Sequence, residues 1–189
     1  NLFSHMGAKA RAYLKGRGLN QDVVRTFQIG YAPNSWHALQ KYLVTRGIEI
    51  DVALKAGLLG RGRRGSFDWL RDRIVFPIID VYGRVVGFGG RLLEGDGPKY
   101  LNTSESPLFS KGTQLYGLNV AKESLTRGSR LVLVEGYMDV VCLYRHGFSQ
   151  VVASLGTAFT RQQARLIRRY TTDVVVAYDA DAAGQSAAM

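Results

Sequence analysis

Two short aliphatic runs, each ending at an acid, constrain the fold of this chain more than any other feature. Leu131–Val134 stops at Glu135 and Gly136, and Val174–Tyr178 stops at Asp179. Runs of this length, bounded by a charge and a glycine, are typical of strands buried on both faces of a parallel sheet. The sequence therefore predicts two such strands with acids at their carboxyl ends.

The acids that follow these runs are Glu135, Asp179 and Asp181. Open α/β sheets place their chemistry at the carboxyl ends of the strands, and two adjacent strands would aim these side chains at one point. Three clustered anions are costly unless a cation joins them. We therefore expect a metal site at this edge of the sheet.

Strands and helices alternate over short connections from Arg130 to the end of the chain. This alternation predicts a parallel sheet with right-handed crossovers. Thr160 is the expected N-cap of the helix that begins at Arg161. The expected order is strand Arg130–Val134, helix Tyr137–Gly147, strand Gln150–Ala153, helix Arg161–Tyr170, strand Asp173–Tyr178 and the start of a helix at Ala182–Met189.

The preceding residues predict a mixed region with four short helices and a hairpin. Asn20 and Ser35 are the expected N-caps of the second and third helices, Trp36 is interpreted as a core residue rather than a base-stacking platform, and Gly60–Gly65 as a mobile basic loop. The expected elements are helices Ala8–Gly16, Gln21–Gln28, Trp36–Thr45 and a fourth that starts at Ile50 or Asp51 and ends at Ala56, strands Arg73–Asp80 and Arg84–Arg91, and a linking helix Val120–Thr126.

Composition separates a basic part from a nearly neutral one. The 189 residues carry a net charge of +10, with 17 Lys and Arg against 9 Asp and Glu up to residue 120, and 8 against 6 beyond it. This asymmetry predicts that the first part binds a polyanion such as a nucleic acid. No apolar run approaches the roughly 20 residues that span a bilayer. A single cysteine excludes an internal disulfide and fits a reducing cytoplasm.

Seven sequence blocks then show that the chain resembles the RNA polymerase core of bacterial DnaG-type primases. The last three blocks also resemble the toprim module, which type IA and type II topoisomerases share in outline, whereas the three blocks before them are peculiar to primases. The blocks are Arg71–Ile78, Gly87–Arg91, Pro98–Asn102, Lys111–Gly117, Val134–Val140, Ala153–Thr157 and Tyr178–Gly184.

The resemblance implies a fold of two parts. An α+β amino-terminal subdomain, residues 7–121, is expected to bind template and nucleotide. An α/β toprim subdomain with a Rossmann-like parallel sheet, residues 122–189, is expected to be incomplete at its carboxyl end.

The resemblance also implies roles for particular residues. Magnesium, or manganese in its place, would be held by Glu135, Asp179 and Asp181. Asp139 either joins this site, directly or through water, or is a structural acid in the first turn of its helix. Contacts to nucleotide or DNA are expected from Arg71, Arg73, Arg91, Lys99, Tyr100, Asn102 and Lys111.

The implied activity is template-directed synthesis of short RNA primers on single-stranded DNA from ribonucleoside triphosphates, at the bacterial replication fork in the cytoplasm. The zinc module of the family and the domain that binds the replicative helicase are expected to lie outside this chain, and no membrane partner is expected. Because the chain stops inside the next helix, activity of this piece alone is left open. Two alternatives remain: a single-stranded-DNA-binding fragment without activity, and a topoisomerase-like or nuclease-like toprim protein.

Overall fold

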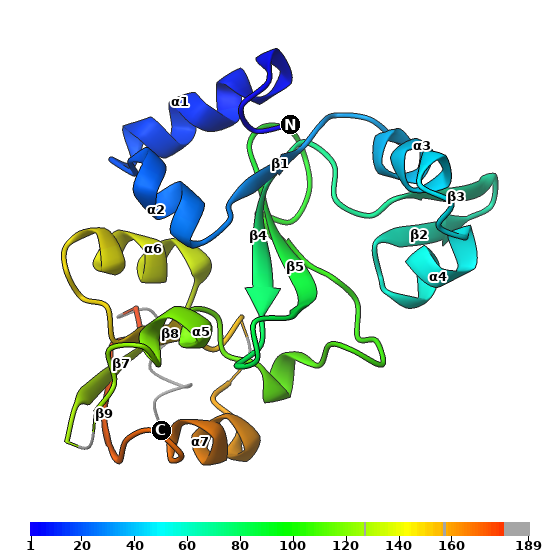
Figure 1. Cartoon of the computed structure of the whole chain (residues 1–189). Coiled ribbons are helices and arrows are strands. Elements are labelled where there is room, and N and C mark those ends of the chain that lie inside the picture. The colour runs from blue at the N-terminus through cyan, green and yellow to red at the C-terminus, as the bar shows by residue number, and fades with distance from the viewer. Residues whose placement is uncertain (127, 157, 180–189) are drawn as a thin grey trace. The chain divides into compact units, whose positions relative to one another are not determined.

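The computed structural model describes residues 1–126, 128–156 and 158–179. The chain forms two compact units, which Figure 1 draws together and which are described separately below. The first contains Asn1–Arg17, Gln28–Pro77 and Gly87–Phe109, and the second contains Gly18–Phe27, Ile78–Val86 and the chain from Ser110 onward. The predicted α+β part followed by an α/β part is confirmed. The ranges 7–121 and 122–189 stay a prediction.

The first unit is built on a four-stranded sheet with the order β1-β4-β5-β6. The neighbouring positions of β4 and β5 confirm the predicted hairpin, whereas the short strands β1 and β6 were not predicted. Strand β1 pairs with β4 only as far as Val75, so Pro77 lies where no β1 residue needs its missing N–H. The elements are 3-10 helix η1 (His5–Gly7), α1 (Ala8–Gly16), β1 (Gly30–Ala32), α3 (Ala38–Thr45), α4 (Ile50–Lys55), β2 (Leu59–Gly62), β3 (Gly65–Asp68), β4 (Arg73–Ile79), β5 (Val85–Leu92) and β6 (Tyr100–Asn102).

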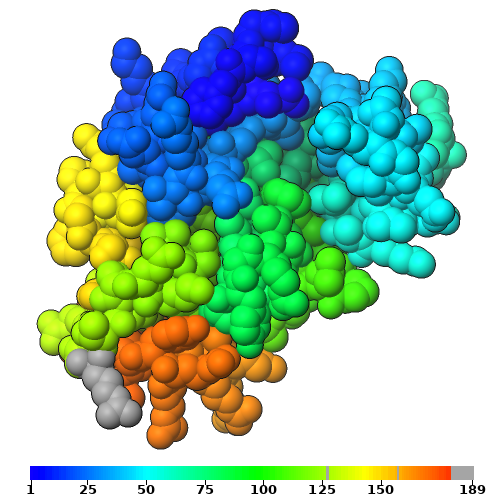
Figure 2. Space-filling view, viewed as in Figure 1, coloured from blue at the N-terminus to red at the C-terminus, as the bar shows by residue number. Residues whose placement is uncertain are grey.

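Helices α3 and α4 share a small core of Leu43, Ala53 and Leu59, and Figure 2 shows this region in cyan as a closely packed mass. The prediction that Ser35 caps α3 is wrong. The main-chain N–H groups of Leu39 and Gln40 donate to the Asp68 carboxylate at 2.6 and 2.9 Å, and Asp68 is only 3% exposed. A side chain distant in sequence therefore satisfies the first turn of this helix.

The interpretation of Gly60–Gly65 as a mobile loop is also wrong. Strands β2 and β3 pair antiparallel here, with Gly62 opposite Gly65. The ring of Phe67 lies where a side chain at Gly60 would stand, 2.5 Å from the position that a Cβ atom would take. Glycine at this position thus serves packing within a hairpin. Although Gly60–Gly65 has the glycine spacing of a dinucleotide-binding loop, an antiparallel hairpin is not the strand–loop–helix context that such a loop requires.

The second unit contains the predicted parallel sheet, in the order β8-β7-β9. The prediction that both acid-ended strands are buried on both faces is wrong for β9, an edge strand of the described sheet in which Val175 and Val176 are 40% and 46% exposed. Helix α6 connects β7 to β8, and α7 connects β8 to β9 on the far side of β7, so right-handed crossovers place the two helices on opposite faces (Figure 1). The elements are α2 (Gln21–Thr26), 3-10 helix η2 (Lys111–Thr113), α5 (Leu118–Ala121), β7 (Arg130–Val134), α6 (Tyr137–Arg145), β8 (Val151–Ala153), α7 (Arg161–Ile167) and β9 (Asp173–Val176).

The local signals at these elements are largely confirmed. Asn20 and Thr160 accept hydrogen bonds from the N–H groups of Val23 and Gln163 at 3.0 and 3.1 Å, as N-caps do. The predicted bounds of the linking helix, Val120–Thr126, are wrong, since α5 starts at Leu118 and ends at Ala121. The predicted helix at Ala182–Met189 lies outside the described residues. Leu131 and Leu133 of β7 pack with Ile167 of α7 in a fully buried core.

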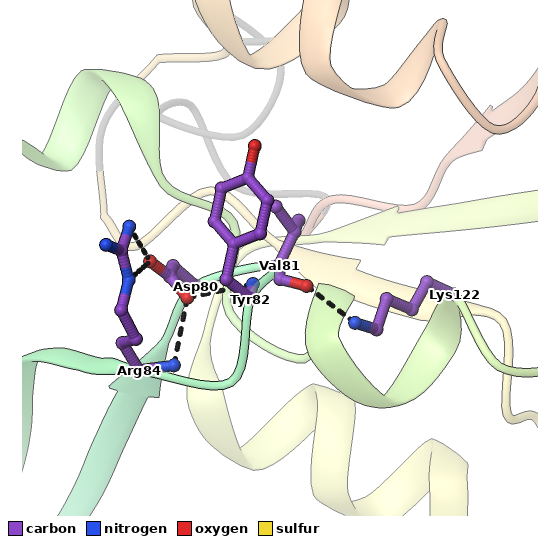
Figure 3. Close-up of polar contacts among 5 residues, drawn as sticks. All are labelled: Asp80, Val81, Tyr82, Arg84 and Lys122. Atoms are coloured by element: carbon purple, nitrogen blue, oxygen red, sulfur yellow. Dashed lines mark hydrogen bonds and ion pairs between the residues drawn. The ribbon is translucent and has the colours of Figure 1, made fainter.

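The turn between β4 and β5 is held by a buried acid. Asp80, 8% exposed, accepts hydrogen bonds from the N–H groups of Tyr82 and Arg84, both at 2.9 Å, and from the Arg84 guanidinium at 2.8 Å. Lys122, directly after α5, donates to the carbonyl of Val81 at 2.6 Å (Figure 3). These contacts fix the turn against α5. Among the described residues, no helix has the length and apolar character to cross a membrane.

Candidate functional site

The carboxyl ends of β7 and β9 bring two of the predicted acids together. These strands pair in parallel, with Leu133 opposite Val176, so Glu135 and Asp179 follow neighbouring strands at the same edge of the sheet. The main-chain N–H of Asp179 donates to Glu135 Oε1 at 2.9 Å. Asp181, the third predicted acid, lies outside the described residues.

Asp139 lies in the first turn of α6, beside this pair. Its carboxylate accepts a hydrogen bond from the N–H of Gly136 at 2.9 Å, which satisfies a free donor at the start of the helix. Loss of hydration raises the pKa of Asp139, and the negative charge of Asp179 raises it further, whereas the Gly136 hydrogen bond acts in the opposite direction. Asp139 therefore caps the helix, and it is close enough to Asp179 for the two charges to interact. Its part in a metal site stays a prediction.

Within residues 1–126, 128–156 and 158–179, no three His, Cys, Asp or Glu side chains are gathered in a way that would hold a metal ion. The described part of the edge therefore supplies carboxylates without a complete ligand set. The role of Asp181 as a further ligand remains a prediction from the sequence.

Arg71, in the first unit, is held by aromatic rings. Its guanidinium lies over the ring of Trp36 at 3.9 Å and over that of Phe67 at 5.2 Å, and it also donates to the carbonyl of Asp68. Trp36 is 59% exposed, so its interpretation as a core residue is wrong. Arg71 and Phe67 are half-buried beside the exposed Trp36, and together they form a cationic and aromatic surface, a composition suited to nucleic acid.

Arg73 is buried, with only 5% of its surface exposed. Its guanidinium donates to the carbonyls of Gly90 and Pro98 at 3.1 and 2.9 Å. Burial lowers its pKa, and the positive charge of Arg71 lowers it further, while Asp72 opposes the shift. Its observed partners are main-chain atoms, so it fixes the segment that precedes Lys99. Its predicted contact with nucleotide or DNA stays a prediction.

Arg91 lies between two tyrosine rings. It stands opposite Tyr100 in the β5–β6 pair and donates to the Tyr100 hydroxyl at 2.8 Å. Its guanidinium lies 4.7 Å from the centre of the Tyr13 ring and 5.3 Å from that of Tyr100. Sequence reasoning missed Tyr13, because nothing in its local pattern distinguishes a helical tyrosine that contacts a distant strand.

The remaining predicted contact residues lie on exposed or half-buried segments. Lys99 and Tyr100 are exposed at the start of β6. Asn102 ends that strand, and its carbonyl accepts a hydrogen bond from the indole N–H of Trp69 at 2.9 Å. Lys111, in the second unit, begins η2.

Comparison with known proteins agrees with this architecture. Residues 1–122 match the family described as the N-terminal domain of the DNA primase catalytic core, and residues 129–189 match the Toprim domain. The DNA primases of Deinococcus radiodurans and Escherichia coli are 46% and 45% identical over 98% and 100% of this chain. The chain spans about a third of the length of these relatives, 33% and 32%.

Solved structures show the same similarity. The catalytic core of E. coli primase superposes with a TM-score of 0.92 at 44% identity, covering 99% of this chain and 60% of that one. The RNA polymerase domain of Mycobacterium tuberculosis primase DnaG gives 0.91 at 37% identity, covering 99% and 64%. A DnaG primase catalytic domain bound to single-stranded DNA gives 0.90 at 44% identity, covering 99% and 59%.

The parallel sheet with acids at its carboxyl edge is therefore a toprim module, joined to a basic α+β region. The family match over residues 1–122 defines that region as a primase domain, which favours primase over topoisomerase. The chain belongs to the bacterial DnaG-type DNA primases, within their catalytic core.

Proposed function

We propose that this chain carries the catalytic centre for template-directed synthesis of RNA primers on single-stranded DNA. The observation that carries the proposal is the hydrogen bond between the N–H of Asp179 and the carboxylate of Glu135, which holds two acids together at the carboxyl ends of β7 and β9 in a toprim sheet. The substrates would be a single-stranded DNA template and ribonucleoside triphosphates. The ribonucleotides would be joined on the template with release of pyrophosphate.

The chemistry of these acids fits a hard divalent cation such as Mg²⁺. Glu135 and Asp179 follow neighbouring strands at this edge and Asp139 lies beside them, so their negative charges are close together, and a cation relieves such charge. The pKa of Asp139 is raised mainly by lost hydration, and the charge of Asp179 adds to this shift. Glu135, Asp179 and Asp181 would hold the ion, because carboxylate oxygens are its preferred protein ligands. When bound, it would supply charge neutralisation at phosphate and a lower pKa for the attacking 3′ hydroxyl.

The residues of the chain have separate tasks in this proposal. The main-chain N–H of Asp179 orients the Glu135 carboxylate through a hydrogen bond. Lys111 and Lys99 neutralise phosphate charge, and Arg71 and Arg91 contact the template backbone. Tyr100 and Asn102 would contact nucleotide or template, and Tyr100 also orients Arg91 through its hydroxyl.

The test is a dinucleotide-synthesis assay with template, ribonucleoside triphosphates and magnesium. The protein assayed contains this chain and has the same length as the related primases. We expect synthesis in the wild type, and loss of synthesis with retained folding in Asp179→Asn. Equal rates in both proteins would exclude the proposal. Template binding without synthesis in the wild type would instead favour the second candidate, a DNA-binding segment without activity, which the similar primase bound to single-stranded DNA keeps in view.

A further inference from the structure

The segment that carries Lys111 lies at the same edge of the second unit as the acids. Tyr116 and Ala153 exchange two main-chain hydrogen bonds of 3.0 Å in an antiparallel bridge. Ala153 is the last residue of β8, which runs parallel to β7. Because the bridge is antiparallel, the residues before Tyr116 continue past the carboxyl end of β8. Lys111–Gln114 thus lies beyond the strand ends, as Glu135 and Asp179 do.

Gln163 holds this segment from inside the protein. Gln163 lies on α7 and is 0% exposed, which is unusual because glutamine is mostly found at the protein surface. The amide nitrogen donates to the carbonyls of Lys111 and Gln114 at 3.1 and 2.8 Å, and lies 3.3 Å from that of Ser154, directly after β8. One side chain therefore ties both ends of η2 to the end of the sheet.

Thr160 adds a second connection to the same segment. Its hydroxyl donates to the carbonyl of Gly112 at 2.6 Å while accepting from the N–H of Gln163 at 3.1 Å. The Gln163 side-chain oxygen accepts from the N–H of Thr160 at 3.1 Å, which closes a reciprocal pair. The two capping residues of α7 thus also donate to two successive main-chain carbonyls, Thr160 to that of Gly112 and Gln163 to that of Lys111.

The energetics argue for a role beyond helix capping. An apolar side chain at position 163 would fill the core without the cost of removing an amide from water. A glutamine offsets that cost only when its amide nitrogen and oxygen form hydrogen bonds inside the protein. Here those bonds go to carbonyls of the Lys111 segment, and a Thr cap alone would already satisfy the start of α7. The arrangement is suited to fixing where the main chain of Lys111 lies relative to the strand ends.

We propose that Thr160 and Gln163 are positioning residues that hold Lys111 against the phosphates of the incoming nucleotide. This rests on the proposed function, in which Lys111 neutralises phosphate charge. Neither residue touches substrate in this scheme, because their donor groups are used by the carbonyls of Lys111, Gly112 and Gln114.

The experiment is a double-mutant cycle in the protein at the full length of its relatives, measured as steady-state dinucleotide synthesis. Thr160→Val removes the hydroxyl, and Thr160→Ser is the matched control that keeps it. Each is also combined with Lys111→Ala. We expect Thr160→Val to raise the KM for ribonucleoside triphosphate about fivefold, Thr160→Ser to stay within about twofold of wild type, and Thr160→Val to add nothing once Lys111 is Ala.

Three outcomes overturn the inference, and they separate it from the proposed function. An unchanged KM in Thr160→Val, or an equal effect of Thr160→Val with and without Lys111, leaves Lys111 in its role but excludes positioning. An unchanged rate in Lys111→Ala excludes positioning and also removes the proposed role of Lys111. If Thr160→Val fails to fold, Thr160→Asp takes its place, because aspartate keeps the cap acceptor and lacks the donor.

Discussion

The main-chain N–H of Asp179 donates to the side chain of Glu135, so an acid three residues beyond β9 is bound to the acid directly after β7. This contact joins two strand ends that are 44 positions apart in the sequence. Glu135 is therefore a candidate metal ligand and also the hydrogen-bond acceptor that holds the main chain at Asp179. Removing its charge and removing its acceptor are therefore different perturbations.

Glu135→Gln should abolish most primer synthesis without unfolding the protein. The amide oxygen can still accept from the N–H of Asp179, whereas the charge that attracts a cation is lost. We expect dinucleotide synthesis to fall at least about 100-fold while the thermal midpoint changes little. Asp173→Asn is the matched control, because Asp173 lies at the opposite end of β9 in an exposed ion pair with Arg130. A comparable loss in the control would contradict the assignment.

Asp80→Asn should destabilise the protein in a pH-dependent way. Burial alone would raise the pKa of Asp80, but the hydrogen bonds and charge of Arg84 and the N–H of Tyr82 outweigh it and lower the pKa below its ordinary value of 3.8. An acid with a lowered native pKa stabilises the fold above that ordinary value, and this stabilisation is lost as the pH falls through the native pKa.

We therefore expect the variant to lose about 1–3 kcal/mol in the free energy of unfolding at pH 7. The difference from wild type should shrink below pH 3.8. Urea unfolding at a series of pH values measures this. Arg84→Ala is a milder control, since the N–H groups of Tyr82 and residue 84 still reach the carboxylate. A loss that is constant across pH would exclude this explanation.

Arg91→Ala should weaken binding of single-stranded DNA in a salt-dependent way. If the guanidinium neutralises one phosphate, its loss makes the negative slope of log affinity against log salt concentration shallower by roughly 0.7. Titration of a labelled oligonucleotide at several salt concentrations measures the slope. Arg130→Ala is the control, because Arg130 pairs with Asp173 at the amino end of the toprim sheet. An unchanged slope in Arg91→Ala would remove this residue from the DNA interface.

Asp68→Ala should destabilise α3 although Asp68 lies far from that helix in the sequence. Its carboxylate accepts from two N–H groups in the first turn, and truncation leaves both without this acceptor. We expect a loss of about 2 kcal/mol in the free energy of unfolding. Ser35→Ala, at the position that the sequence suggested as the cap, should cost less than about 0.5 kcal/mol. Chemical denaturation of the two variants compares them directly.

The sequence by itself determined the toprim sheet and the likeness to primases. Leu131–Val134 and Asp173–Val176 reveal parallel strands through their apolar runs, and Thr160 reveals a helix start, because these signals depend on residues adjacent in the chain. Burial did not follow from the same runs, since Val175 and Val176 are exposed. The apolar pattern alone gives no strand order, so the adjacency of β7 and β9, which brings Glu135 and Asp179 to one edge, is established by the strand pairing.

Only the tertiary structure decided which side chains serve those elements from a distance. Asp68 caps α3, Arg73 is buried against main-chain carbonyls, and Trp36 is exposed beneath Arg71. Local pattern gives no signal for such contacts, since an arginine in a strand or a tryptophan before a helix has the same neighbours in sequence whether it is buried or exposed. The backbone path brings the partners together, and that path is set by the packing of the whole unit.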